Sequence, residues 1–373
     1  MQDRDFGTTL YRAASGTEYT TVQAPTPPKR KERYWLHILL FALTFLSTTY
    51  AGMLFSTAAD DSFASIGDIL ANLHRGLPFS ALLMLFISAH EFGHYFAARA
   101  HKVDATLPFY IPMPVLSLFG TMGAVIRTRT VVPSRRAMFD IGVAGPIAGF
   151  VVALAYLIIG MITMPGIESL YAVHPEYRAL AALPAEGTRF GGFLLFGILK
   201  KLLIAPGRFF PGMNEIYHYP LLAVGWFGMF VTALNMIPVG QLDGGHVTYG
   251  MFGRAQQKLS RWFVGFLIFS GLGTLCTLLR DLIREHHQGS FFDLLGVTLG
   301  PPLEWLTRHA GWWMHGWLGW LLWVAIILIF IKIPHPPVPD ETPLDRKRMI
   351  IGWCALAILV LTFTFTGVFE LVR

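Results

Sequence analysis

The stretch ISAHEFGHYFAARA, residues 87 to 100, decides the fold class of this chain. It carries two histidines and a glutamate in the spacing HExxH, at the end of an apolar run that begins near residue 77. A helix needs about 20 mostly apolar residues to cross the hydrocarbon core of a bilayer, and this run has that length. The stretch therefore predicts a membrane-spanning helix that contains a polar site.

The composition of the whole chain agrees with a membrane protein. Of its 373 residues, 54% are hydrophobic and 14% are charged, which is more apolar surface than a soluble domain can bury. We expect an all-α polytopic membrane protein with about seven transmembrane helices. The expected spans are residues 35–55, 77–98, 138–161, 219–237, 261–279, 313–333 and 350–369. The shorter run 191–203 is expected to form a half-span or an interfacial helix.

The basic residues predict which way the chain crosses the membrane. With the polar tail 1–34 on the inside, the inside loops hold 19 of the 29 Lys and Arg residues, as the positive-inside rule requires. The tail shows no signal-peptide cleavage site and is expected to be retained in the cytoplasm. This bias accounts for the net charge of +6, so no nucleic-acid partner is expected. With Arg99 at the boundary, His94 lies about 7 Å and His90 about 14 Å below the inner surface.

The HExxH helix carries the candidate metal ligands. His90 and His94 project from the same helix face, so that one metal ion can take a nitrogen from each. Glu91 lies on the neighbouring face, where its carboxylate can act as a general base towards water. Such side chains are costly in lipid unless they are paired or functional. A polar cluster that only joins helices is the alternative interpretation.

A catalytic zinc ion usually has three protein ligands and one open position. The stretch NMIPVGQLDGGH, residues 235 to 246, offers Asp243 as the third ligand. Pro238 and Gly240 are expected to interrupt the preceding helix, which puts Asp243 near the depth of the histidines. Asn235 is a candidate donor to a substrate carbonyl or to a developing oxyanion, or alternatively a polar contact between helices.

These motifs together resemble the site-2 protease family of intramembrane zinc metalloproteases. HEFGH at 90–94 and NMIPVGQLDGG at 235–245 are similar to the paired signatures of that family, and DIGVAGPIAGF at 140–150 resembles its glycine-rich middle helix. The resemblance implies one zinc ion per chain. It further implies that His90, His94 and Asp243 are the ligands, that Glu91 is the general base, and that Asn235 contacts the substrate or transition state.

The resemblance also implies a short re-entrant β-hairpin after the HExxH helix, in the segment 107–130. A helical substrate hides its amide groups, so it must be unwound before hydrolysis, and pairing with an exposed strand edge would compensate for the lost hydrogen bonds. The expected substrate-pairing edge consists of Phe119, Gly120, Thr121, Met122 and Gly123. An ordinary connecting hairpin is the alternative.

The sequence departs from many members of that family in one respect. Between the middle helix and the LDG motif, residues 162–218 are too few for a PDZ domain, so no PDZ-mediated partner is expected. The expected organisation is a cytoplasmic tail (1–34), a first anchor helix with an external loop (35–76), a catalytic core (77–260), and three additional helices with their loops (261–373).

The remaining polar residues are given simpler interpretations. Capping explains Asp140, at the start of the middle helix, and His246 is a candidate for supporting a metal ligand without binding the ion itself. Cys276 and Cys354 are expected to pack in spans, without a disulfide. Interfacial or solvated roles are expected for the histidines near span ends or in loops, which are His37, His74, His101, His174, His218, His286, His287, His309, His315 and His335.

The sequence thus predicts an intramembrane zinc metalloprotease that cleaves single-span membrane-protein substrates among membrane lipids. We expect a multi-pass protein of the bacterial inner membrane with a cytoplasmic N-terminus. Two alternatives stay open: a transporter of zinc or another divalent metal, and an inactive relative that binds membrane helices. Transport would favour polar residues through the whole membrane depth, whereas here they collect at one shallow level.

Overall fold

The computed structural model describes residues 8–12, 19–23, 32–57, 65–114, 117–184, 187–285 and 290–371. Most of the expected tail, together with His286 and His287, lies outside these residues. The chain divides into two compact units, Met1–Leu36 and His37–Arg373. In the first unit, strands β1 (Thr8–Arg12) and β2 (Tyr19–Gln23) pair in antiparallel register.

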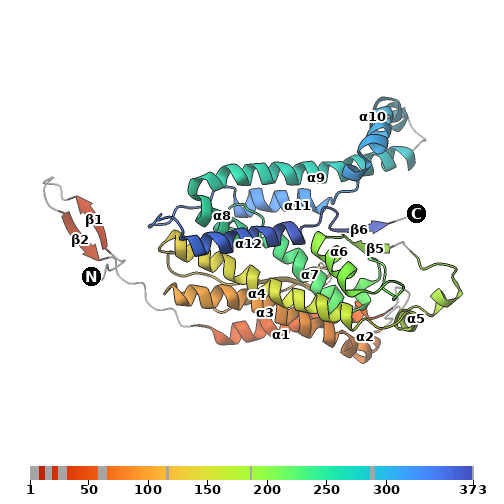
Figure 1. The fold of residues 1–373 in the computed structure, drawn as a ribbon, viewed down its shortest axis with the longest axis horizontal. Helices are drawn as coiled ribbons and strands as arrows, with labels where there is room; N and C mark the ends of the chain where they lie inside the picture. Colours follow the sequence, from red (N-terminus) through yellow and green to blue (C-terminus); the bar gives the residue numbers. More distant parts are fainter. Residues whose placement is uncertain are drawn as a thin grey trace. The chain divides into compact units, whose positions relative to one another are not determined.

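The rest of the described chain is mostly helical, with two further pairs of short strands (Figure 1). Strand β3 (Phe109–Pro112) pairs with β4 (Thr121–Val125), and β5 (Gly187–Phe190) pairs with β6 (Val368–Leu371), both antiparallel. The helices are α1 (Tyr34–Phe55), α2 (Ile66–Asn72), α3 (Leu77–Ala100), α4 (Arg135–Ile162), α5 (Glu168–Val173), α6 (Leu194–Leu203), α7 (Pro220–Asn235), α8 (Asp243–Phe252), α9 (Gln256–Glu285), α10 (Ser290–Met314), α11 (Gly319–Ile326) and α12 (Arg346–Thr362).

Fewer helices than expected are long enough to cross a membrane. Within the described residues, four helical stretches have the length and hydropathy of a span: Tyr34–Phe55, Ile66–Ala100, Arg135–Ile162 and Asp243–Glu285. A fifth is added if Phe291–Met314 and Gly319–Ile331, which are bent by 64° relative to each other, form one broken span. The structure therefore has four or five candidate spans where the sequence predicted seven.

The difference comes mainly from α7 and α12. Helix α7 has 16 residues and α12 has 17, so each is about 24–26 Å long, short of a hydrocarbon core of about 30 Å. Helix α7 ends at Asn235, where the NMIPVG turn begins. The expected last span, 350–369, stops at Thr362, and Val368 already belongs to β6.

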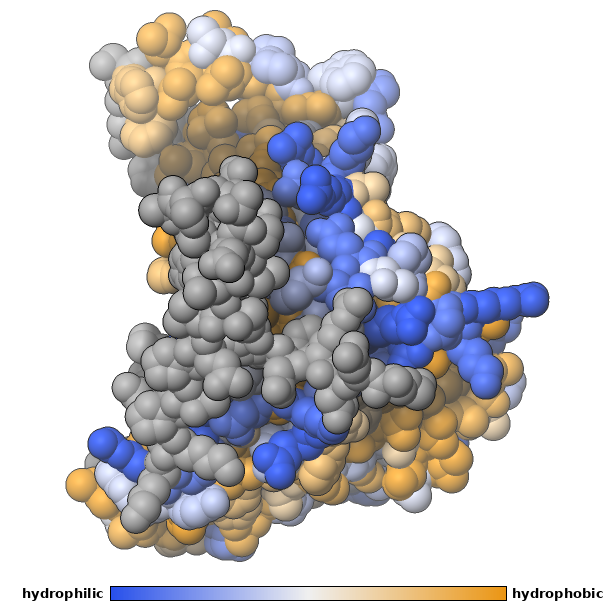
Figure 2. Space-filling view, turned by 90° about the vertical axis from the view of Figure 1, so that its left-hand side faces the viewer, coloured by the Kyte–Doolittle hydropathy of each residue, from blue (hydrophilic) through white to orange (hydrophobic). Residues whose placement is uncertain are grey.

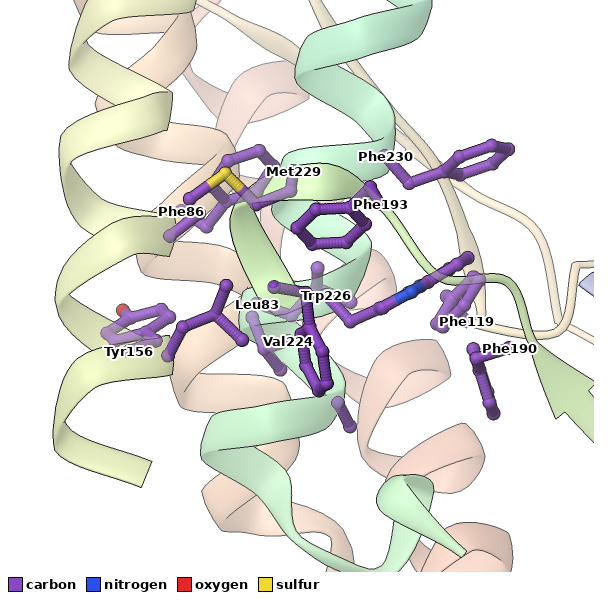
Figure 3. Close-up of a cluster of buried hydrophobic side chains, with 14 of the residues drawn as sticks. Leu83, Phe86, Phe119, Tyr156, Phe190, Phe193, Val224, Trp226, Met229 and Phe230 are labelled. Atoms are coloured by element: carbon purple, nitrogen blue, oxygen red, sulfur yellow. The ribbon is translucent and has the colours of Figure 1, made fainter. Parts of the chain in front are cut away.

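The hydrophobic core lies where α3, α4 and α7 pack on one another. Trp226 of α7 is fully buried, and its indole nitrogen donates to the carbonyl of Gly191 at 2.7 Å. Figure 3 shows this side chain between Phe193 and Phe190, with Leu83 and Phe86 of α3 nearby. An apolar layer therefore surrounds α7 along most of its length.

One end of the helices presents a polar surface. Figure 2 views the end at which α1, α4 and α12 begin, and hydrophilic residues gather over the middle of that face with hydrophobic residues on its flanks. Helix α3 ends on the same side, at Ala100. The polar site of α3 is therefore only a few turns from this polar surface.

Candidate metal centre

Two histidines of α3 and the first residue of α8 converge on one point. The Nε2 atoms of His90 and His94 lie 3.1 Å apart. The Oδ2 atom of Asp243 lies 3.4 Å from His90 Nε2 and 3.3 Å from His94 Nε2. Two ligands at zinc–nitrogen distance from one tetrahedral ion are about 3.3 Å apart, so the three atoms have the spacing that a single metal ion requires.

The hydrogen bonds around the cluster turn its acceptor atoms inward. His94 Nδ1 lies 2.7 Å from the carbonyl oxygen of Ile141. Because a carbonyl only accepts, Nδ1 carries the proton and the lone pair of Nε2 faces His90 and Asp243. The rings of both histidines are buried, with 4% and 7% of their residue surfaces exposed. Converging acceptor atoms repel one another unless a cation lies between them, so these three atoms fit a metal ion.

Glycines of α4 make room for both imidazoles. A Cβ atom at Gly145 would overlap the His94 ring, and one at Gly149 would stand 3.2 Å from His90 Nδ1. On the other helix, a Cβ at Gly93 would be 2.7 Å from the carbonyl oxygen of Ala144. The glycine-rich stretch DIGVAGPIAGF therefore allows α3 and α4 to approach closely at the depth of the metal ligands.

The broken helix puts Asp243 in place. Helix α7 ends at Asn235 and α8 begins at Asp243, with Gly240 at a φ of +54° in the turn between them. That backbone conformation favours glycine. Asn235 itself reaches the centre, since its Nδ2 lies 3.3 Å from His90 Nε2. The interruption that Pro238 and Gly240 indicate thus brings the end of one helix and the start of the next to the same site.

Glu91 lies beside the cluster and next to the strand pair. Its side chain is buried, with 8% of the residue exposed, and it interacts with His94, with Asp243 and with the main chain at Ile126, one residue beyond β4. Strand β3 is fixed to α3 by Tyr110, whose hydroxyl lies 2.7 Å from Ser88 Oγ. The carboxylate is therefore held between the metal ligands and an extended segment of chain.

The five residues of the expected substrate-pairing edge separate into two groups. Phe119 is buried, and its ring packs against Phe227 at 3.9 Å. Gly120 has a φ of +76° and its carbonyl accepts from Ser47 of α1 at 2.6 Å.

Thr121 pairs with β3 and donates to the carbonyl of Ile111 at 2.8 Å. Met122 is 56% exposed, and no atom lies near the side-chain position of Gly123. Phe119 and Thr121 thus make side-chain contacts within the protein and Gly120 is held through its carbonyl oxygen, which leaves Met122 and Gly123 at the surface.

The structure corrects two other interpretations of the sequence. Asp140 does not cap α4, because Ser134 is the N-cap. Its carboxylate instead accepts two hydrogen bonds from Arg348 of α12, at 2.8 and 2.7 Å, and lies 2.8 Å from His101 Nε2.

His335 is buried and not solvated, and burial lowers its pKa, which favours the neutral ring. It donates from Nδ1 to the carbonyl of Pro336, so its Nε2 accepts from His246 Nδ1 at 2.8 Å. His246 packs against Gly142 of α4 and thus supports the α4–α8 contact.

The structure also brings together a cluster that the sequence interpretation missed. Interfacial or solvated roles were expected for His174 and His218 and none was assigned to Glu215, yet the ligand atoms of the three residues lie within 4.8 Å of one another. The Glu215–His218 spacing of three residues was the one available signal. His174 lies 41 residues before Glu215, in a different loop, so no local motif joins the three.

These observations define a helical protein with several candidate membrane spans and a buried His-His-Asp centre beside a glutamate. The chain belongs to Peptidase family M50, whose family model matches residues 78–278. The match contains α4, α7, α8 and all of α3 except Leu77, and these are the helices that build this centre.

Similar proteins are found among plants. "Probable zinc metalloprotease EGY1, chloroplastic" of Arabidopsis thaliana is 30% identical over 288 residues, which cover 77% of this chain and 42% of the relative. The protein of the same name from Oryza sativa subsp. japonica is 32% identical over 187 residues, or 50% of this chain and 30% of the relative.

"Probable zinc metalloprotease EGY2, chloroplastic" of Oryza sativa subsp. indica is 29% identical over 213 residues, or 57% of this chain and 36% of the relative. The chain thus spans less than half the length of these relatives. No solved structure matches the chain.

Proposed function

We propose that the chain is a zinc-dependent intramembrane protease that hydrolyses a peptide bond within or near the transmembrane segment of a single-span membrane protein. The observation that carries the proposal is the convergence of His90, His94 and Asp243 beside the buried Glu91, at the end of an apolar helix. Membership in Peptidase family M50 and the printed names of the plant relatives support it.

His90, His94 and Asp243 would hold one zinc ion. When bound, zinc supplies Lewis acidity, which activates water and polarises a carbonyl. Within the chain, Ile141 orients the His94 ring through its carbonyl, and Gly145 and Gly149 leave the space that the rings occupy.

Glu91 would transfer a proton from the attacking water to the leaving amide nitrogen. It follows His90 directly, and its carboxylate is within the electrostatic influence of His94 and Asp243. In this position it accepts a proton from the attacking water and returns it to the leaving amide nitrogen. Asn235, whose Nδ2 already points at the centre, would donate to the oxygen on which negative charge develops.

The strand pair would receive the substrate. The described part of this sheet contains only β3 and β4, so one edge of β4 has no neighbouring strand. An extended substrate segment that pairs along β4 from Met122 and Gly123 would reach Ile126, whose main chain interacts with Glu91. We propose that this pair re-enters the membrane from the polar end and that the pairing keeps the substrate unwound.

The finer topology is part of the same proposal. Helix α7 is short but is packed by α3, α4 and α12, so it could complete a crossing inside the bundle without facing lipid. The distribution of Lys and Arg supports a cytoplasmic N-terminus. The relatives named above are chloroplastic, so the bacterial inner membrane rests on the sequence expectation alone.

Co-expression tests the proposal. The chain and its Glu91→Gln variant are expressed with a panel of single-span membrane proteins, and cleavage is followed by the appearance of shortened fragments. Cleavage by the unmodified chain that is lost both in Glu91→Gln and on zinc chelation supports the protease. Cleavage that persists in Glu91→Gln contradicts it, and zinc flux into vesicles without any cleavage favours the transporter.

A further inference from the structure

A second group of metal-type ligands lies where the chain enters α7. His174 follows α5, and Glu215 and His218 stand just before α7 begins at Pro220. Asn235, the last residue of α7, contacts the first cluster. The 16 residues of α7 rise about 24 Å, so the two clusters lie near opposite ends of this helix.

The three ligand atoms lie within 3.9 Å of one another, slightly farther apart than the 3.4 Å of the first cluster. His174 Nε2 and His218 Nε2 lie 3.1 Å apart. Glu215 Oε2 lies 3.3 Å from His218 Nε2 and 3.9 Å from His174 Nε2. The side chains are almost completely buried, with exposed fractions of 7%, 4% and 2% for His174, Glu215 and His218.

Each ring donates a hydrogen bond from its other nitrogen to an oxygen outside the centre. His218 Nδ1 lies 2.7 Å from the carbonyl oxygen of Phe55, at the end of α1, so it must carry the proton. His174 Nδ1 lies 2.9 Å from Glu176 Oε1, an exposed carboxylate that accepts a hydrogen bond from it. Both Nε2 lone pairs therefore face inward, and carbonyl or carboxylate oxygens that accept from the other ring nitrogen are the usual partners of metal-bound histidines.

The carboxylate is oriented in the same way. Glu215 Oε1 accepts from Tyr177 at 3.2 Å and from Asn214 at 2.9 Å. Glu215 Oε2 is buried and accepts no hydrogen bond from the described residues. An unpartnered buried carboxylate oxygen beside two inward lone pairs is strongly unfavourable without a cation.

We propose that His174, Glu215 and His218 form a second divalent-metal site, of the zinc class, at the end of α7 opposite the Glu91 centre. Two imidazoles and one carboxylate suit zinc and are poor ligands for magnesium or calcium. The burial of all three ligands favours a structural role. A bound ion would join the segment after α5 to the start of α7, and through the bond of His218 to Phe55 it would also fix the end of α1.

This proposal does not depend on the first centre, and metal counting separates the two. The full chain is purified in detergent, stripped with a chelator, titrated with zinc and analysed for bound metal. His94→Ala removes a ligand of the first cluster, Glu215→Gln keeps the size of the side chain while removing the free oxygen, and His309→Ala changes an exposed histidine as the control.

We expect about two zinc ions per chain for the unmodified protein and for His309→Ala, about one for His94→Ala, and none for the double variant His94→Ala with Glu215→Gln. A His94→Ala chain that binds no zinc, or one whose zinc is unaffected by Glu215→Gln, overturns the proposal. Loss of one ion in Glu215→Gln but none in His94→Ala supports the second site and counts against the first.

Spectroscopy keeps the test decisive if Glu215→Gln does not fold. X-ray absorption of zinc bound to the His94→Ala chain, which needs no change in the second cluster, should show two imidazole ligands. An ion with one imidazole or with oxygen ligands only would contradict the site. Added zinc should also raise the unfolding temperature of His94→Ala, and an unchanged temperature would contradict the structural role.

Discussion

Gly145 of α4 lies directly against the imidazole of His94, so that even a single methyl group at position 145 would overlap the ring. The position of this metal ligand is thus determined by a residue that offers no ligand atom. Gly145→Ala should displace His94, lower zinc occupancy and reduce cleavage by at least about 100-fold, as misplacement by about 1 Å can. Zinc content and cleavage rate of the purified variant check this.

Gly265 of α9 provides the matched control. It is also a helical glycine, and no atom lies near its side-chain position. Gly265→Ala should leave zinc content and cleavage unchanged. If both variants behave like the unmodified protein, close packing of α3 on α4 does not position the centre.

Substitutions at Phe119, just before β4, and at Met122, within β4, should have different effects. Phe119 packs on Phe227 in the core, so Phe119→Ala should destabilise the protein by roughly 3–5 kcal/mol. Met122 is largely exposed, so Met122→Ala should leave the unfolding temperature unchanged while altering cleavage of the substrate. Thermal unfolding and cleavage assays on both variants distinguish packing from substrate binding. If Met122→Ala cleaves every tested substrate at the normal rate, substrate does not bind at the edge of β4.

Asn235 should act on the rate and not on metal binding. Asn235→Ala removes the Nδ2 group beside His90, and loss of such a donor lowers kcat by about 10²–10³-fold. Zinc content should stay the same. Thr232→Val, one turn earlier and buried, is the control and should keep its rate. A large loss of zinc in Asn235→Ala would instead assign this residue to the metal site.

The start of α12 should make stability depend on pH. Hydrogen bonds from Arg348, first from its backbone amide, hold the pKa of Asp345 below the ordinary value of 3.8. The ionised carboxylate of Asp345 therefore stabilises the fold at a pH above 3.8. This stabilisation is lost as the pH falls through the lower pKa that the group has in the folded protein. Asp345→Ala should unfold at a lower temperature at pH 7, and the difference should shrink below pH 3.8. A difference independent of pH would contradict the capping role.

Much of the first centre could be predicted because its ligands stand in short motifs. HExxH fixes two histidines on one helix face, and the proline and glycine before Asp243 mark a helix break. The second cluster could not be predicted in this way. Its three ligands come from loops whose approach depends on the packing of α1, α5 and α7.

The predicted number of spans was not confirmed, and the burial of Phe119 was not foreseen, for a related reason. Hydropathy indicates that a segment is apolar, but not whether it faces lipid or other helices. The segment around α7 is as apolar as a span because the core surrounds it. Phe119 stands in a segment with strand-like residues, yet the neighbouring aromatic side chains bury it. Such outcomes depend on tertiary contacts that the local pattern does not contain.

The central claim is that Glu91 performs proton transfer at a metal centre formed by His90, His94 and Asp243. The most direct test measures zinc content and cleavage of a single-span substrate together, for the purified chain and for Glu91→Gln in liposomes. We predict unchanged zinc content and a loss of cleavage of at least about 100-fold, in line with general acid–base catalysis. Cleavage by Glu91→Gln at the unmodified rate, with zinc still bound, would contradict the account.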